Sequence, residues 1–312
     1  MKNIKHILIC GAGMMGKNIA FVMSSNPAYE VGVYDLYPTD VEAGIRTNTK
    51  QLVDKGILTE EELAERLSRI SFTTDIDSAM VSKADFVIEA VFEDMQVKRD
   101  TFAKLEARCR PDTIFCTNSS VMSPSEISRD LTYRERFVGT HFWNPGHLIP
   151  LVEVIKSDAS SDDVAQTVME VLASVGKEPV LCKKDVPGFI ANRMQHALWR
   201  EAISIVERGI ADAATVDKAV KYSFGLRLPK LAPMENADMV GIDLTYNIHD
   251  YILKDLEDSH EPSPLLKQLR DEGKLGFKTG EGFQTWTAEE TAASGAALNE
   301  YLIDYIAKQK NN

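Results

Sequence analysis

At 312 residues, with 44% hydrophobic and 26% charged residues, the chain has the composition of an ordinary globular protein and enough length for two hydrophobic cores. Its net charge of −12 argues against nucleic acid or an anionic membrane as a partner, because such partners are bound through an excess of Lys and Arg. No apolar run approaches the length of a membrane span.

The four cysteines, Cys10, Cys109, Cys116 and Cys182, form no C-x-x-C pair, and three of them fall in apolar runs typical of strands. We expect them to be reduced core residues of a cytoplasmic protein. The first predicted strand runs directly into a glycine motif, so we expect no signal peptide ahead of it.

The N-terminal half alternates short apolar runs with amphipathic stretches of helical spacing. Strands are predicted at residues 4–10, 29–34, 70–73, 85–90 and 113–117. This alternation predicts a parallel, doubly wound sheet of the α/β class, the Rossmann type. Further strand-like runs, at 137–141, 151–155 and 178–182, are expected to extend the sheet.

A long insertion at residues 38–69 interrupts this alternation. Within it, Thr59 followed by Glu62 matches the capping box that begins a helix, and Gly56 precedes it. The insertion is therefore predicted to form two helices joined near Gly56.

After KKDVPG at 183–188 the pattern becomes helical throughout, and its last helix-like stretch covers 287–309. Pro187 and Gly188 mark the change. We therefore expect a Rossmann-type domain over residues 1–184 and an all-α domain over 185–312.

The first chemical motif is HILICGAGMMGKNIA, in which a predicted strand leads into Gly11-x-Gly13-x-x-Gly16 and then a helix. Gly11 permits a tight turn, Gly13 allows backbone amides to approach a pyrophosphate, and Gly16 allows close helix–strand packing. Asp35 ends the second strand, where a carboxylate can accept from both ribose hydroxyls. A 2′-phosphate would meet that charge, so the expected cofactor is NAD.

Polar side chains cluster where other predicted strands end, the edge at which open α/β sheets bind ligands. Glu89 lies on an otherwise apolar strand, and Glu93 and Lys98 follow just beyond it. The next strand ends in CTNSS, which places Ser119 at the same edge. A cap for the following SPSEI segment is the alternative role for this serine.

The segment HFWNPGHLIPLVE contains His141 and Glu153. A strand-like run would deliver His141 to the same edge, and Glu153 could approach its ring from behind. A carboxylate on one ring nitrogen supports positive charge and leaves the other nitrogen free to take a proton. The polar surroundings favour this general base over a structural histidine, and His147 is expected to be a surface or pocket residue. The histidines show no metal-binding spacing, so no metal is expected.

Five separated blocks make the sequence resemble the L-3-hydroxyacyl-CoA dehydrogenase family over nearly its whole length. They are GAGMMG, VIEAVFEDMQVKRDTF, TNSS, HFWNPGHLIPLVEVI with KKDVPGFIANRM, and GFKTGEGF. The resemblance implies an NAD-dependent oxidoreductase of fatty acid metabolism. It also implies a Rossmann-type domain, a helical domain that forms a homodimer interface, and a substrate cleft between the two domains.

Carried over residue by residue, the resemblance makes His141 the general base and Glu153 its partner. It places Ser119 and Asn192 as hydrogen-bonding groups around the reacting oxygen, where they would donate to developing negative charge. The positions near the nicotinamide half of the cofactor are Glu93, Lys98, Asn144 and Lys278.

The substrate divides the expectations. The P-x-x-I-P-L-V-E form resembles branches that oxidise free hydroxy acids, such as carnitine and gulonate dehydrogenases, and Arg227 or Lys230 could pair with a substrate carboxylate. The insertion, with Lys50 and Lys55, resembles the hairpin that contacts CoA in the family. We expect a 3-hydroxyacyl-CoA thioester, with a free 3-hydroxy acid as the alternative.

A non-enzymatic dinucleotide-binding relative is the hypothesis from another class. It would be expected to lack the base or its partner, and His141, Glu153, Ser119 and Asn192 are all present.

Overall fold

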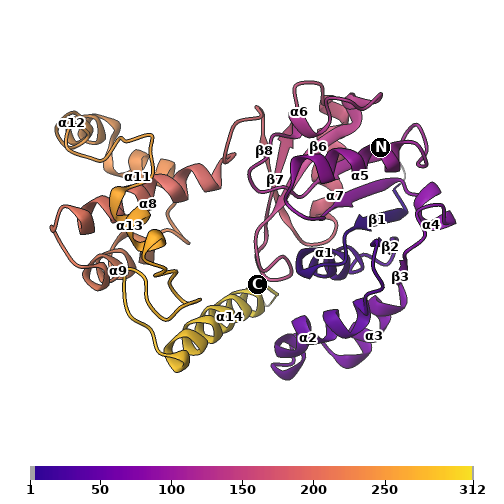
Figure 1. Cartoon of the computed structure of the whole chain (residues 1–312), viewed down its shortest axis with the longest axis horizontal. Coiled ribbons are helices and arrows are strands. Elements are labelled where there is room, and N and C mark those ends of the chain that lie inside the picture. The colour runs from indigo at the N-terminus through magenta and orange to yellow at the C-terminus, as the bar shows by residue number, and fades with distance from the viewer. Residues whose placement is uncertain (1–3, 311–312) are drawn as a thin grey trace. The chain divides into compact units, whose positions relative to one another are not determined.

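The computed structural model describes residues 4–310, which fall into two compact units (Figure 1). The first unit runs to Ala191 and takes up the chain again from Glu300. The second unit is Asn192–Asn299. The first thus holds the predicted NAD-binding residues 1–184 as far as they are described, together with the end of the chain.

The first unit is built on one eight-stranded sheet of order β3-β2-β1-β4-β5-β6-β7-β8. Its strands are β1 (His6–Cys10), β2 (Glu30–Tyr34), β3 (Ile70–Thr73), β4 (Phe86–Glu89), β5 (Ile114–Thr117), β6 (Phe137–Phe142), β7 (Leu151–Lys156) and β8 (Glu178–Cys182). Each corresponds to a predicted run. The prediction of a doubly wound α/β sheet followed by an all-α region is therefore confirmed.

One pair of neighbouring strands, in the extension of the sheet, is not parallel. β6 and β7 are antiparallel, while every other neighbouring pair is parallel. The connection at residues 143–150 contains no helix, and parallel neighbours need a crossover of a dozen or more residues. The short loop therefore forces β7 to return directly alongside β6.

Helices cover both faces of the sheet. They are α1 (Met14–Met23), α2 (Val41–Asp54), α3 (Glu60–Ser68), α4 (Ala79–Ser82), α5 (Met95–Glu106), α6 (Pro124–Ile127) and α7 (Asp162–Ala173), with a short 3-10 turn at Arg134–Arg136. The predicted helical pair is present as α2 and α3. Thr59 and Glu62 form the capping box that begins α3, so that prediction is confirmed.

Successive residues of β1 supply the two halves of the core. Ile7 and Ile9 join a cluster that includes residues of α1, α2, α3 and α7, whereas Leu8 and Cys10 join a cluster with α4, α5 and α6. This alternation is the period of two expected of a strand that is buried on both faces. All four cysteines of the chain are free and buried.

The end of the last helix, α14 (Ala288–Lys310), packs on the first unit. Ile303 is 1% exposed within the larger core cluster, and Leu302 and Ile306 pack against that cluster. The Lys55 ammonium makes ion pairs with Glu300 at 3.2 Å and Asp304 at 3.0 Å. The C-terminal turns of α14 are thus fixed to the α2–α3 hairpin by apolar packing and by charge.

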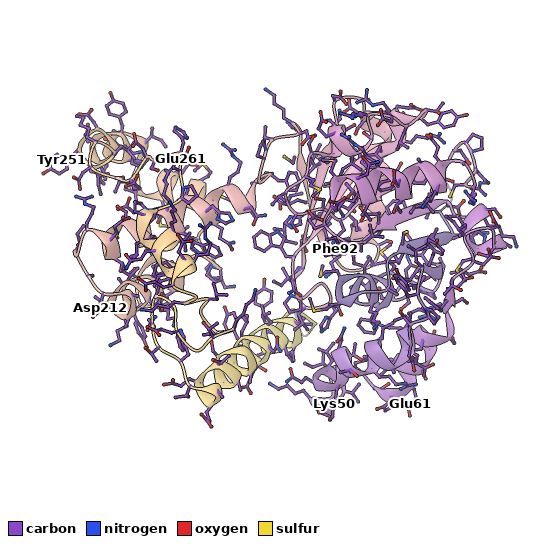
Figure 2. All side chains as sticks on the ribbon, in the orientation of Figure 1. Lys50, Glu61, Phe92, Asp212, Tyr251 and Glu261 are labelled. Atoms are coloured by element: carbon purple, nitrogen blue, oxygen red, sulfur yellow. The ribbon has the colours of Figure 1, made fainter. Side chains whose placement is uncertain are left out.

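The second unit is entirely helical. It contains α8 (Ala191–Glu207), α9 (Ala213–Lys221), α10 (Phe224–Arg227), α11 (Pro233–Val240), α12 (Ile242–Ile252) and α13 (Pro264–Asp271), with the first turns of α14. Of residues 192–299, all of which are described, Ser204 alone is buried. Large apolar side chains are exposed instead, among them Met234 at 76% and Tyr251 at 86%, the latter labelled in Figure 2.

No helix within residues 4–310 combines the length and apolar character needed to cross a membrane.

Candidate active site

The turn between β1 and α1 is built around two glycines that no other residue could replace. Gly11 has φ +107°, and a Cβ there would lie 2.6 Å from the carbonyl oxygen of Ala90. A Cβ on Gly16 would lie 1.8 Å from the carbonyl oxygen of Gly11. Both separations are shorter than van der Waals contact, so this turn needs glycine for its own packing.

Gly13 differs from its two neighbours in the motif. A Cβ there would meet nothing within 4 Å, so the protein's own packing does not explain the residue. Gly13 is the N-cap of α1, and no side chain caps this helix end. The first N–H groups of α1 therefore have no side-chain cap, and uncapped N–H groups at a helix start can bind a pyrophosphate.

Asp35 follows directly on β2 and lies beside this turn. Its Oδ2 accepts from the Ala12 amide at 2.6 Å, and its Oδ1 accepts from the Tyr37 amide at 3.1 Å. Each carboxylate oxygen has a further lone pair, and two ribose hydroxyls need two acceptors. The glycine turn, the uncapped helix and Asp35 together fit a dinucleotide.

His141 and Glu153 are direct partners across β6 and β7. The Nδ1 of His141 lies 2.8 Å from Oε2 of Glu153, and the two side chains are 5% and 0% exposed. The rings of Trp143 and Phe189 lie beside the imidazole, with centroids at 5.5 Å and 5.7 Å. Among residues 4–310, Nε2 of His141 has no hydrogen-bond partner, so it is the nitrogen left to receive a proton.

Four donors hold the Glu153 carboxylate. Oε1 accepts from the backbone amides of Ile190 at 2.9 Å and Ala191 at 3.0 Å, and Trp143 Nε1 approaches Oε2 at 3.3 Å. Burial alone raises the pKa of Glu153, but the bonds from His141 and these donors outweigh burial and hold the pKa below its ordinary value. Glu153 is therefore an ionised partner for a protonated imidazole.

Ser119, Glu93, Lys98 and Glu89 form a second cluster at the carboxyl ends of β4 and β5. The Ser119 hydroxyl donates to Oε1 of Glu93, and Lys98 Nζ lies 3.1 Å from Oε2 of the same carboxylate. Lys98 also pairs with Glu89 at 2.7 Å. The structure thus brings together four side chains, Glu89, Glu93, Lys98 and Ser119, that were expected at this edge from the sequence.

The remaining predicted residues are in the loop after β6, on the α2–α3 hairpin and in the second unit. Asn144 is exposed in the loop after β6, joined to Pro145 by a cis peptide bond. Lys50 is exposed on α2, labelled in Figure 2, and pairs with Asp54 at 2.6 Å, while Lys55 pairs with the end of α14. Asn192, Arg227, Lys230 and Lys278 belong to the second unit. Their roles stay predictions.

Two residues that support the site, Trp143 and Lys177, were not predicted from the sequence. Trp143 lies two positions after His141, a spacing that puts alternate strand residues on one side, and this could have linked it to Glu153. Lys177 precedes β8 and is buried, and its Nζ donates to the carbonyl oxygens of Gly146 at 2.6 Å and Ile149 at 2.7 Å. Lys177 thus holds the loop that joins β6 to β7, and no local pattern predicts this.

His147 lies in the same loop and is half-buried. Burial, with the nearby Lys177 charge, lowers its pKa to about 4. The residue is therefore neutral near pH 7.

No group of three or more His, Cys, Asp or Glu side chains that could hold a metal occurs in the described part of the chain.

Two family models match most of the chain. The family described as "3-hydroxyacyl-CoA dehydrogenase, NAD binding domain" matches residues 6–186, and the C-terminal domain of the same family matches 188–286. The cofactor is accordingly NAD, as Asp35 predicted, and the chain is an NAD-dependent oxidoreductase. The helix α14 lies beyond the matched region.

Individual relatives cover most of the chain. The 5-formyl-3-hydroxy-2-methylpyridine 4-carboxylate 5-dehydrogenase of Mesorhizobium japonicum is 33% identical and covers 96% of both chains. The mitochondrial hydroxyacyl-coenzyme A dehydrogenase of Homo sapiens is 36% identical over 90% of both. A solved structure of the same pyridine carboxylate dehydrogenase activity, described as an NAD+ dependent dismutase, matches with a TM-score of 0.87, 32% identity and 97% of both chains.

Proposed function

Because the chain belongs to the 3-hydroxyacyl-CoA dehydrogenase family, we propose that it oxidises the secondary alcohol of an L-3-hydroxyacyl-CoA to the 3-ketoacyl-CoA, reversibly, with His141 as general base. The observation that supports this most directly is the buried His141–Glu153 pair, which leaves Nε2 open. A single base is sufficient for this chemistry. The metabolic setting we propose is fatty acid metabolism.

Oxidation of a secondary alcohol removes a proton from the hydroxyl oxygen and a hydride from the carbon that carries this oxygen. NAD, when bound, supplies the hydride acceptor. Nε2 of His141 takes the hydroxyl proton, for which the substrate oxygen must lie within about 3 Å. Glu153 then stabilises the imidazolium through Nδ1, and its own four donors prevent it from taking the proton instead. In the reverse direction His141 returns this proton to the ketone oxygen.

Other residues are proposed to bind and orient the ligands. Gly11, Gly13 and Gly16 with the N-terminus of α1 would hold the pyrophosphate of NAD, and Asp35 its adenosine ribose. Glu93, Lys98, Asn144 and Lys278 are proposed around the nicotinamide half. Ser119 and Asn192 are proposed as hydrogen-bonding groups for the reacting oxygen.

A free 3-hydroxy acid is the second candidate substrate, and the contacts of the hairpin favour it. A CoA thioester carries several phosphate charges and needs free cations, whereas Lys50 and Lys55 are already paired with carboxylates. The relative from Mesorhizobium japonicum is named for a pyridine carboxylate rather than for a thioester. For a free acid, Arg227 or Lys230 would supply the cation.

Initial rates of NAD reduction across a panel of 3-hydroxyacyl-CoA esters and free 3-hydroxy acids test the proposal. For a thioester, Lys50→Glu with Lys55→Glu should raise KM without changing the kinetics in NAD. The matched control is Glu300→Gln with Asp304→Asn, which frees the Lys55 ammonium and should lower the same KM. The thioester proposal is wrong if the wild-type protein turns over a free 3-hydroxy acid but no acyl-CoA, and if Arg227→Glu abolishes that turnover. The free 3-hydroxy acid is then the substrate.

A homodimer through the second unit is also proposed. A unit in which Ser204 alone is buried has no apolar core of its own. It carries an open pocket of about 980 Å³, lined by Trp199, Phe277, Phe283 and Trp286 among others. Burial of such surface by a second copy would supply the missing core. Sedimentation of the intact chain at micromolar concentration should show a dimer, and a stable monomer would contradict this proposal.

We also propose that the protein is cytoplasmic, because its four cysteines are free.

A further inference from the structure

Lys98 and Glu89 form a fully buried ion pair at the ligand-binding edge of the sheet. Lys98 Nζ lies 2.7 Å from Oε1 of Glu89, and the two side chains are 1% and 0% exposed. Two charges taken out of water give little net stability, and apolar residues of similar volume often serve as well. A pair kept at the ligand-binding edge of the sheet therefore needs a second explanation.

Both oxygens of Glu89 are held in place. Oε1 also accepts from the Val91 amide at 2.8 Å, and Oε2 accepts from the Thr117 hydroxyl at 2.7 Å. Burial raises the pKa of Glu89 despite the opposing effect of Lys98 and these bonds. Because the Val91 amide and the Thr117 hydroxyl hold the Glu89 carboxylate in place, this carboxylate in turn fixes the position of the Lys98 ammonium.

Lys98 passes this constraint to Glu93. Its Nζ lies 3.1 Å from Oε2 of Glu93, while Oε1 of Glu93 accepts from the Ser119 hydroxyl and from the Ser120 amide at 3.2 Å. The oxygen of Ser119 accepts in addition from the Met122 amide at 3.0 Å. A carboxylate can only accept, so the Ser119 proton points to Glu93 and one lone pair of Oγ remains for a ligand.

We infer that Lys98 and Glu89 form a positioning pair that fixes, through Glu93, the direction of the Ser119 O–H bond, so that Ser119 meets its ligand as a hydrogen-bond acceptor. The complementary ligand group is an O–H or N–H donor, such as the alcohol to be oxidised. This inference rests on the proposed function and refines it, since Ser119 was expected to donate. Lys98 then acts on Ser119 through Glu93.

The effect of the Lys98 charge on the pKa of Glu93 provides a test of the Lys98–Glu89 pair. Burial raises the pKa of Glu93, but the bond from Ser119 and the charge of Lys98 outweigh burial and keep the pKa below its ordinary value. Cys10, the neighbour of Glu89 on β1, has a pKa raised by burial and by Glu89, so its thiol adds no charge. Removal of Lys98 should therefore raise the pKa of Glu93.

The test compares Lys98→Met with the double variant Lys98→Met/Glu89→Gln. The single variant leaves the Glu89 charge buried and alone and is expected to unfold more easily, whereas the double variant leaves no uncompensated buried charge. Arg110→Met is the matched control. It breaks the Arg110–Asp85 pair at the opposite end of β4, where Asp85 accepts from the backbone amides of Lys5 and His6.

Two measurements decide the outcome. The first is the pH profile of kcat/KM, and the second is the titration of the Glu93 side-chain carboxyl in the free protein by 13C NMR, assigned with Glu93→Gln. The inference predicts that the double variant folds, that its Glu93 titrates at higher pH than in the wild-type protein, and that a limb of its pH profile moves to higher pH with Glu93. Arg110→Met should lower stability and leave both titrations unchanged.

A double variant with the wild-type Glu93 titration and the wild-type pH profile would overturn the inference and leave the pair a structural role alone. A wild-type protein without turnover on any substrate would instead count against the proposed function. The NMR titration needs no turnover, so it still decides the inference in that case.

Discussion

His141 and Glu153 occupy directly opposed positions on the antiparallel strands β6 and β7, and their side chains meet at 2.8 Å. The register of the backbone sets this relationship, since directly opposed residues on an antiparallel pair have their Cβ atoms about 5 Å apart on the same face. A shift of one residue would send the carboxylate to the other face of the sheet. The sheet itself therefore holds the two side chains together.

Replacement of Glu153 by Gln should slow turnover and also change the response to acid. Glu153 has a lowered pKa in the folded protein, so its ionisation stabilises the fold fully above the ordinary value of 4.5, and this stabilisation is lost as the pH falls through the folded-state pKa. The variant should be less stable than wild type at pH 7, and the difference should shrink below about pH 4.5. Urea unfolding at several pH values measures it. An unchanged difference at low pH would argue that Glu153 is not ionised in the native state.

The three glycines of the β1–α1 turn should respond differently to alanine. Gly16→Ala places a Cβ 1.8 Å from a carbonyl oxygen and should destabilise the fold, whereas Gly13→Ala meets nothing within 4 Å and should fold normally. If a pyrophosphate lies against Gly13, that variant should still lose NAD affinity. Thermal unfolding and NAD titration of both variants separate the two effects. If Gly13→Ala binds NAD with the wild-type affinity, the pyrophosphate does not lie against Gly13.

Asp35 should decide between NAD and NADP. Asp35→Ala removes charge-assisted bonds to the ribose worth roughly 1.5–3 kcal/mol each at most, so NAD should bind more weakly and its advantage over NADP should narrow. Asp35→Asn is the matched control for the fold, because an amide oxygen can still accept from the Ala12 amide. Equal or tighter binding of NADP by the wild-type protein would show that Asp35 does not read the ribose.

His147 should make the fold sensitive to mild acid. Its pKa is lowered to about 4 from an ordinary 6.5, so the unfolded chain binds the proton at higher pH than the folded protein does. Stability should therefore fall between about pH 6.5 and 4, by up to roughly 1.4 kcal/mol per pH unit from this group. His147→Leu should flatten that part of the profile. A variant as steep as wild type would assign the sensitivity to other groups.

The elements of the first unit could be predicted from sequence because strands buried on both faces read as apolar runs, and the glycine motif with Asp35 has a fixed spacing. The antiparallel return of β7 was missed, although the helix-free connection at 143–150 implies it. The burial of Ile303 against the first unit could not be predicted, since it depends on a tertiary contact with a hairpin far away in sequence. Glu89 was noticed only as a polar residue on an apolar strand. Its pairing with Lys98 depends on how α5 packs against the sheet.

The most direct test of the account is the turnover of His141→Ala measured together with its affinity for NAD. General-base catalysis commonly contributes about 10² to 10⁴ in rate, so turnover should fall by about 100-fold or more while NAD binds as it does to wild type. His141→Gln, which keeps a polar side chain beside Glu153, should be as inactive. Near-normal turnover in either variant, with the fold intact, would contradict the assignment of His141 as the base.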